Sequence, residues 1–146
     1  MESEATILKV DTSKRVAQDI NTEPTGFPSP AADFFEEAIN IQDYLTPNPT
    51  ATFFVKYTSH SMKEAGIFPG SILVIDRSLR VKNNAIVLAV INGEFYVKHY
   101  IKNSSGIRLV AANKNCQPIP ISDDMDFSIW GVVAKIITDV DCISGL

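Results

Sequence analysis

The stretch AIVLAVINGEFYVKHYI, residues 85–101, decides the fold. Two runs rich in β-branched and aromatic residues flank Asn92-Gly93, the strongest short signal for a two-residue hairpin turn, in which both turn residues adopt positive φ. The stretch therefore predicts two antiparallel strands, over residues 85–91 and 94–101, joined by a tight turn.

Four further segments have the same character and are bounded by turn residues. They cover residues 52–57, 71–75, 107–111 and 127–137. Strands at this spacing, accompanied by a single clear helix, predict a mostly β fold with a curled, partly closed sheet.

The first thirty residues differ from the rest. Residues 1–23 are mostly polar, with apolar residues at no sustained period, and residues 23–30 contain three prolines and one glycine. Because proline fixes φ and pushes the preceding residue into an extended conformation, we expect exposed extended backbone here, of the kind a protease binds. The sequence predicts an N-terminal arm over residues 1–28 and one domain over residues 29–146.

One short helix is expected at the start of that domain. Ser29-Pro30 is typical of a helix N-cap followed by the first helical residue. The apolar residues that follow have the i, i+3, i+4, i+7 spacing of one helix face; they are Ala31, Phe34, Phe35 and Ala38.

Composition excludes several classes of protein. With 146 residues, 45% hydrophobic and 21% charged, the chain has the composition of a folded soluble domain. Its 13 Lys+Arg and 17 Asp+Glu give a net charge of -4, which argues against direct binding of nucleic acid, since that requires a concentrated basic face. We expect no membrane span and no secretory signal. Cys116 and Cys142 alone make neither a disulfide framework nor a zinc site, so a reduced, cytoplasmic setting is expected. No metal or cofactor is expected.

Two segments suggest nucleophilic chemistry. The first is Ser59-His60-Ser61-Met62, and the second is GEFYVK, residues 93–98. Together they resemble the Ser-Lys self-cleaving peptidases of the LexA and UmuD family. In that family the nucleophile lies in a Gly-Asp-Ser-Met motif and the base ends a Gly-Glu-x-x-x-Lys strand. The resemblance implies that Ser61 is the catalytic nucleophile and Lys98 the catalytic base.

The resemblance extends over about residues 26–137. GFPSPAAD, residues 26–33, is similar to the segment after the cleavage point in the UmuD branch, and residues 112–113, 118–119 and 130–133 match the family's closing strands. A LexA repressor carries a helix-turn-helix domain before the core, whereas here a short arm precedes it. The scissile bond implied is Thr25-Gly26.

By the same resemblance, the chain forms a homodimer and acts as a serine endopeptidase mainly on itself. A RecA-DNA filament would stimulate removal of the arm. The shortened form would then partner a UmuC-like translesion polymerase in the SOS response, with no direct contact to nucleic acid or membrane. The 35 residues from Gly26 to Ser61 span over 100 Å at about 3.3 Å each, so length leaves cleavage in cis or in trans open.

The proposed chemistry agrees with the residues. A serine hydroxyl is a poor nucleophile until a base takes its proton, and a lysine is a base only as the neutral amine, which burial in an apolar site favours. Lys98 follows the apolar run 95–97, a route to such burial. Ser61 begins an expected helical turn. The backbone amides of this turn, that of Met62 in particular, are candidates for an oxyanion hole.

Some residues depart from the family pattern. Ser59-His60 replaces Gly-Asp before the nucleophile, Gly70-Ser71-Ile72 replaces Gly-Asp-Leu, and Asn84-Ala85 replaces a later Gly-Asp. Thr25 stands where the family has Ala or Cys. Because threonine is branched and stiff at χ1, we expect slow self-cleavage.

Alternative interpretations stay open. One is a binding module that no longer cleaves, with the arm as a permanent cover; another is a signal-peptidase-like enzyme, against which the lack of a membrane anchor counts. A Ser61-His60 pair is disfavoured, since adjacent residues point in different directions, and His99 should likewise face away from Lys98. The acidic residues are expected to form a solvated loop rather than a metal site; they are Asp123, Asp124 and Asp126.

Overall fold

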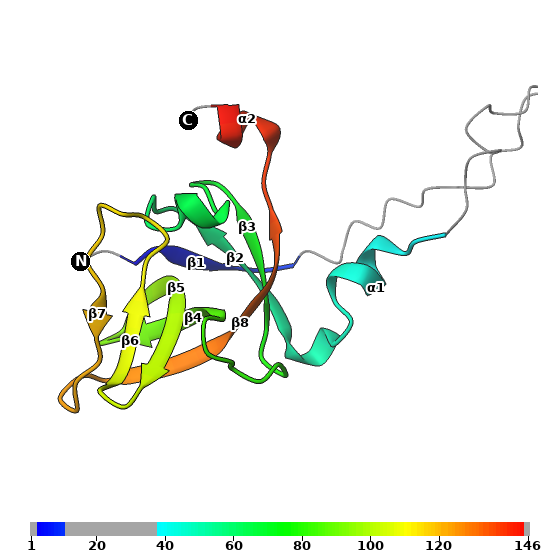
Figure 1. Cartoon of the computed structure of the whole chain (residues 1–146). Helices are drawn as coiled ribbons and strands as arrows, with labels where there is room; N and C mark the ends of the chain where they lie inside the picture. Colours follow the sequence, from blue (N-terminus) through cyan, green and yellow to red (C-terminus); the bar gives the residue numbers. More distant parts are fainter. Residues whose placement is uncertain (1–2, 11–37, 145–146) are drawn as a thin grey trace, which may run out of the picture.

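The structure is a computed structural model that describes residues 3–10 and 38–144. This part of the chain forms an antiparallel eight-stranded sheet in the order β1-β2-β3-β8-β4-β5-β6-β7 (Figure 1). The strands are β1 (Ala5–Leu8), β2 (Thr52–Tyr57), β3 (Ile72–Asp76), β4 (Ile86–Ile91), β5 (Glu94–Asn103), β6 (Gly106–Val110), β7 (Ile119–Pro120) and β8 (Phe127–Ile137). The helical elements are α1 (Ile41–Leu45), the 3-10 turns η2 (Pro49–Ala51) and η3 (Lys63–Ala65), and α2 (Val140–Ser144).

The predicted mostly β fold is confirmed. All six predicted strands are present, and β2 and β8 have the predicted bounds. The turn between β4 and β5 has Asn92 at φ 50° and Gly93 at φ 85°, the positive values that a two-residue hairpin requires. The position of the central hairpin is therefore encoded locally.

The sheet is curled, and β8 contributes to the curl. Its register shifts once against β4, between Leu88 and Ala89, and once against β3, between Val74 and Ile75. Bulges of this kind bend a strand and increase its local twist. As a result β8 turns between the two halves of the sheet (Figure 1).

The segment around β1 partly closes the sheet. β1 pairs with β2 in the register Ala5↔Tyr57. Just before β1, the amide of Glu4 donates to the carbonyl of Phe95 in β5 at 2.8 Å, while the amide of Thr58 donates to the carbonyl of Glu4 at 2.9 Å. One short segment thus joins the end of β2 to β5, two strands that are far apart in the sheet order.

β1 lies within the predicted arm and is not among the predicted strands. The arm boundary at residue 28 stays a prediction. The expected helix after Ser29-Pro30 and the Thr25-Gly26 bond lie outside the described residues.

Two apolar clusters lie on opposite faces of the sheet, because neighbouring strand residues such as Tyr96 and Val97 belong to different clusters. The first contains Tyr57, Met62 and Val97, each fully buried. These three residues are close in sequence to Ser61 and Lys98, so the core fixes both backbone positions. Among the described residues, no helix has the length and apolar character that crossing a membrane requires.

Candidate active site

The loop after β2 positions Ser61. The amide of Ser61 donates to Ser59 Oγ at 3.1 Å, and Asn113 Nδ2 donates to the carbonyl of His60 at 2.9 Å. The next residue, Met62, is fully buried, and its sulfur accepts from the amide of Ala112 at 3.2 Å. The expected helical turn follows as η3. The loop is thus held at three points although Ser59-His60 replaces the family's Gly-Asp.

Lys98 reaches the same place from β5. Its backbone pairs with Val87 of β4 in the middle of the sheet, and its side chain is only 6% exposed. The structure thus brings the two sequence-predicted site residues, Ser61 and Lys98, into one pocket.

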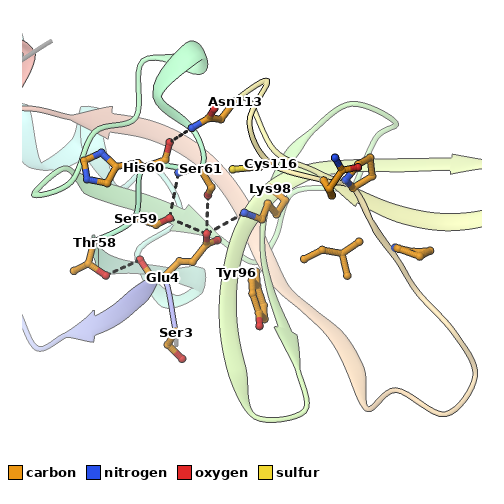
Figure 2. Close-up of a pocket in the computed structure, with 14 residues that line it drawn as sticks. Ser3, Glu4, Thr58, Ser59, His60, Ser61, Tyr96, Lys98, Asn113 and Cys116 are labelled. Carbon is orange, nitrogen blue, oxygen red and sulfur yellow. Dashed lines mark hydrogen bonds and ion pairs between the residues drawn. The ribbon is translucent and has the colours of Figure 1, made fainter. Parts of the chain in front are cut away.

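Glu4 lies between the two side chains (Figure 2). Its Oε2 accepts a hydrogen bond from Ser61 Oγ at 2.7 Å and forms an ion pair with Lys98 Nζ at 2.9 Å. The same oxygen accepts from Ser59 Oγ at 2.9 Å, and Oε1 accepts from the amide of Val97 at 3.1 Å. Ser61 Oγ and Lys98 Nζ both contact the same Glu4 oxygen. The distance between them is therefore at most the sum of the two contact distances.

Tyr57 completes the hydrogen bonding of Ser61. Its hydroxyl lies 2.7 Å from Ser61 Oγ. Since the single hydroxyl proton of Ser61 goes to the Glu4 carboxylate, Tyr57 must be the donor in this contact. Burial raises the pKa of Tyr57 above its usual value, with hydrogen bonds to Ser61, Ser59 and the Met62 backbone opposing the rise. The phenol therefore keeps the proton that it donates.

Glu4, Ser61 and Lys98 line a pocket of about 780 Å³, within the size range of ligand-binding clefts. It is lined by Ser3, Glu4, Thr58, Ser59, His60, Ser61, Tyr96, Lys98, Asn113, Cys116, Gln117, Pro118, Ile119 and Pro120. The pocket is large enough for a short length of peptide beside Ser61.

The two histidines lie as expected. The ring of His60 points away from Ser61 and Lys98 (Figure 2). His99 Nδ1 lies 3.0 Å from the carbonyl of Asn84, and His99 does not line the pocket. Asn84 itself adopts φ 72°, a conformation that asparagine tolerates better than most residues, which explains how it replaces a family glycine.

The acidic residues near β8 do not line the pocket. Asp123, Asp124 and Asp126 are exposed, and Asp124 accepts a hydrogen bond from the Ser122 hydroxyl. In the described part of the chain, no group of three His, Cys, Asp or Glu side chains is arranged to hold a metal ion. Cys116 at the pocket wall and Cys142 in α2 are free thiols.

Sequence reasoning missed Glu4 and Tyr57. Tyr57 ends a predicted strand four residues before Ser61, so its nearness could have been inferred from the chain alone. The only signal near Glu4 is the short β-like run ATIL that follows it. Its partners Ser61 and Lys98 lie 57 and 94 residues away, a separation that no local pattern reveals.

Comparison with known proteins places the chain in a family. The Peptidase S24-like family model matches residues 20–134. Protein SamA of Salmonella typhimurium is 38% identical over 114 residues, covering 78% of this chain and 79% of SamA. Protein MucA of Escherichia coli is 37% identical over 115 residues, covering 78% of each chain. A LexA repressor of Clostridium novyi is 35% identical over 111 residues, covering 76% of this chain and 54% of the repressor. With its mostly β fold and these matches, the chain belongs to the peptidase S24 family, as a UmuD-like member of the LexA and UmuD group.

Proposed function

We propose that this chain is a self-cleaving serine endopeptidase that cuts its own Thr25-Gly26 bond, with Ser61 as nucleophile and Lys98 as base. The observation that carries the proposal is the convergence of Ser61 Oγ and Lys98 Nζ on one oxygen of Glu4 inside a pocket. Membership of the peptidase S24 family supports the same chemistry.

The reaction is an acyl transfer. Neutral Lys98 takes the proton of Ser61 while Ser61 Oγ attacks the carbonyl carbon of Thr25. The bond to the Gly26 nitrogen breaks, and Lys98 passes its proton to that nitrogen. Water then hydrolyses the ester, which releases the Thr25 carboxylate and restores the Ser61 hydroxyl. The backbone amide of Met62 is the candidate donor to the oxyanion.

The biological role follows from the family. Membership among UmuD-like proteins supports a part in SOS mutagenesis. In detail, a RecA-DNA filament stimulates the cut in a cytoplasmic homodimer, and the shortened form partners a UmuC-like translesion polymerase. The net charge of -4 favours recruitment to DNA through these protein partners rather than by direct contact with phosphates.

The test is incubation of the purified full chain at alkaline pH, followed by mass spectrometry of the products. We expect a fragment that begins at Gly26 from the parent protein and from Ser105→Ala, a control at an exposed serine. Ser61→Ala should yield none. It loses one hydrogen-bonding group and about 1 kcal/mol of stability, so a thermal melt verifies that it stays folded. Cleavage of Ser61→Ala at the parent rate would remove Ser61 from the mechanism.

A second candidate is a binding module that no longer cleaves. The observation that favours it is the occupied site, in which Glu4 already engages both Ser61 and Lys98. If the parent chain produces no fragment at any pH or with an added RecA-DNA filament, the binding module becomes the better description.

A further inference from the structure

The segment that leads into β1 lies beside Ser61 and Lys98 in the way an extended peptide would. The Glu4 backbone donates to Phe95 of β5 and accepts from Thr58 after β2, and Ser3 Oγ accepts from the amide of Phe95 at 2.9 Å. Main-chain pairing with exposed strand edges is a general mode of holding an extended peptide. Residues 3–5, here called the inner segment, thus use hydrogen-bonding groups beside Ser61 that a bound substrate would need.

Ala5 anchors the inner segment. It is 4% exposed and belongs to the same buried cluster as Tyr57. Its neighbour Thr6 is exposed on the other side of β1, as alternation along a strand requires. A large charged side chain at position 5 would therefore force the inner segment out, whereas the same side chain at position 6 would extend into solvent.

The Glu4 carboxylate also directs the protons of Ser61 and Lys98 towards itself, so that neither side chain is arranged for proton transfer from Ser61 to Lys98. Ser61 directs its proton at Glu4 Oε2, and Lys98 donates to the same atom. Lys98 Nζ and Glu4 Oε2 form an ion pair at 2.9 Å, in which the lysine is the ammonium partner and has donors only. Lys98 then has no lone pair with which to accept the proton of Ser61.

We propose that Glu4 is an intramolecular inhibitor of the Ser61-Lys98 pair, and that the inner segment must leave the pocket before the Thr25-Gly26 bond can enter it. This inference rests on the proposed function, because it specifies how that same site is regulated. Any binding event that withdraws the inner segment removes the carboxylate and opens the pocket in one step.

Two matched pairs of full-length variants test the proposal. Glu4→Gln removes the charge that pairs with Lys98, and its control is Glu64→Gln, an exposed carboxylate whose contact is the Lys114 amide. Ala5→Arg displaces the inner segment while keeping Glu4, and its control is Thr6→Arg. At neutral pH, Glu4→Gln and Ala5→Arg should self-cleave faster than the parent by roughly tenfold or more, a factor that corresponds to about 1.4 kcal/mol. Both controls should cleave at the parent rate.

A second measurement does not depend on cleavage. In a Ser61→Ala background, acetic anhydride is added at one pH, and acetylation of Lys98 is followed by peptide mass spectrometry. Only the neutral amine reacts, so Glu4→Gln and Ala5→Arg should raise the Lys98 acetylation rate severalfold over Glu64→Gln and Thr6→Arg.

The outcomes distinguish failure of the inhibitor proposal from failure of the proposed self-cleaving function. If Lys98 acetylation rises as expected but no variant cleaves, the proposed function fails while the Glu4 contact with Lys98 is upheld. If cleavage occurs but Glu4→Gln is no faster than Glu64→Gln, the inhibitor proposal is overturned and the proposed function stands. A slower Glu4→Gln would overturn it too, since Glu4 would then be the base that activates Ser61. Unchanged acetylation of Lys98 in both test variants would equally overturn it.

Discussion

Lys98 carries its amino group into a site that is only 6% open to solvent, and Glu4 is the partner that meets it there. Burying a charge without a partner is strongly unfavourable, whereas a hydrogen-bonded ion pair is tolerated. The same pairing works against catalysis, because a base must be neutral to accept a proton. The ion pair that makes burial of the Lys98 side chain tolerable therefore also keeps its amino group from accepting a proton.

The first prediction concerns pH. Self-cleavage should accelerate as pH rises from about 7 to about 9.5, since only neutral Lys98 can accept the proton of Ser61. Lys98→Ala should remove the activity, and so should Lys98→Arg, because the guanidinium stays charged. The measurement is the initial rate of appearance of the fragment beginning at Gly26. A flat profile would count against a titrating lysine.

Tyr57 does not supply this rise in rate. Burial raises its pKa above the usual 10.0, so the phenol stays protonated throughout the range measured. The sign of the effect on stability follows: the folded state resists loss of this proton more than the unfolded state does, so the free energy of unfolding falls once pH exceeds 10.0. Rates are therefore to be compared below that pH.

The second prediction concerns the residue before the scissile bond. Thr25→Ala should cleave faster than the parent by about ten- to a hundredfold, since misfit of one group in a tight pocket is worth about 1–3 kcal/mol. Thr25→Val tests shape without the hydroxyl and should stay slow, and Gly26→Val should be slower still because a side chain crowds the attacking oxygen. A Thr25→Ala protein slower than the parent would mean that the pocket is adapted to threonine.

For single residues, the sequence identifies the candidate site residues that belong to a family motif. Ser61 and Lys98 stand at family spacing, so the sequence alone is enough to propose both. Glu4 is different, because its role arises from a contact with residues far along the chain. A charged residue in a polar segment is usually solvated, and nothing local distinguishes one that becomes buried.

At the scale of elements, β8 shows how one strand serves two neighbours. It pairs with β3 on one side and β4 on the other, and each pairing contains a register shift. At Gly131 of β8, an added Cβ would come within 2.5 Å of Ile75 Cγ2 and 3.3 Å of Arg77 Cγ. The absence of a side chain at this position permits the close approach.

The third prediction follows from that contact. Gly131→Ala should lower the free energy of unfolding by about 1–3 kcal/mol, the usual range for overpacking a well-packed site. Ser128→Ala, at an exposed position of the same strand, should change it by less than about 0.5 kcal/mol. Urea denaturation followed by tryptophan fluorescence measures both. Equal urea midpoints for the two variants would show that β3 and β8 can move apart to admit the extra methyl group without a loss of stability.

The elements that the sequence predicts well are those with strong patterns. The hairpin of β4 and β5 has both a periodic composition and a diagnostic turn, and β2 and β8 are long or aromatic-rich. β1 and β7 have four and two residues, which is too short for any period to stand out. Their pairing is decided by neighbours in space, which explains why the sequence alone does not reveal them.

At the scale of the whole molecule, the sheet closes partly through its own N-terminal strand. β1 pairs along β2 (Figure 1), and the residue before it reaches β5, where Ser3 and Glu4 line the pocket. Strand spacing is enough to predict the curled, partly closed sheet. The segment that closes it falls within the predicted arm, and the structure shows that residues 5–8 of that arm belong to the sheet.

The fourth prediction is the assembly state. Family membership leads us to expect a homodimer, so sedimentation equilibrium at micromolar concentration should give the mass of two 16.0 kDa chains. Ser61→Ala should sediment in the same way, because the change removes one hydroxyl inside the pocket. A parent chain that sediments as a single copy at all concentrations would contradict the expectation.

Whether Ser61 and Lys98 cut the chain is decided by the intact mass of the full-length protein before and after alkaline incubation. We expect two products from the parent, a short piece ending at Thr25 and a long piece beginning at Gly26, and neither product from Ser61→Ala or Lys98→Ala. A cut at any other bond would show that the scissile bond is misplaced. The same two products from Ser61→Ala would contradict the claim that Ser61 and Lys98 carry out the cleavage.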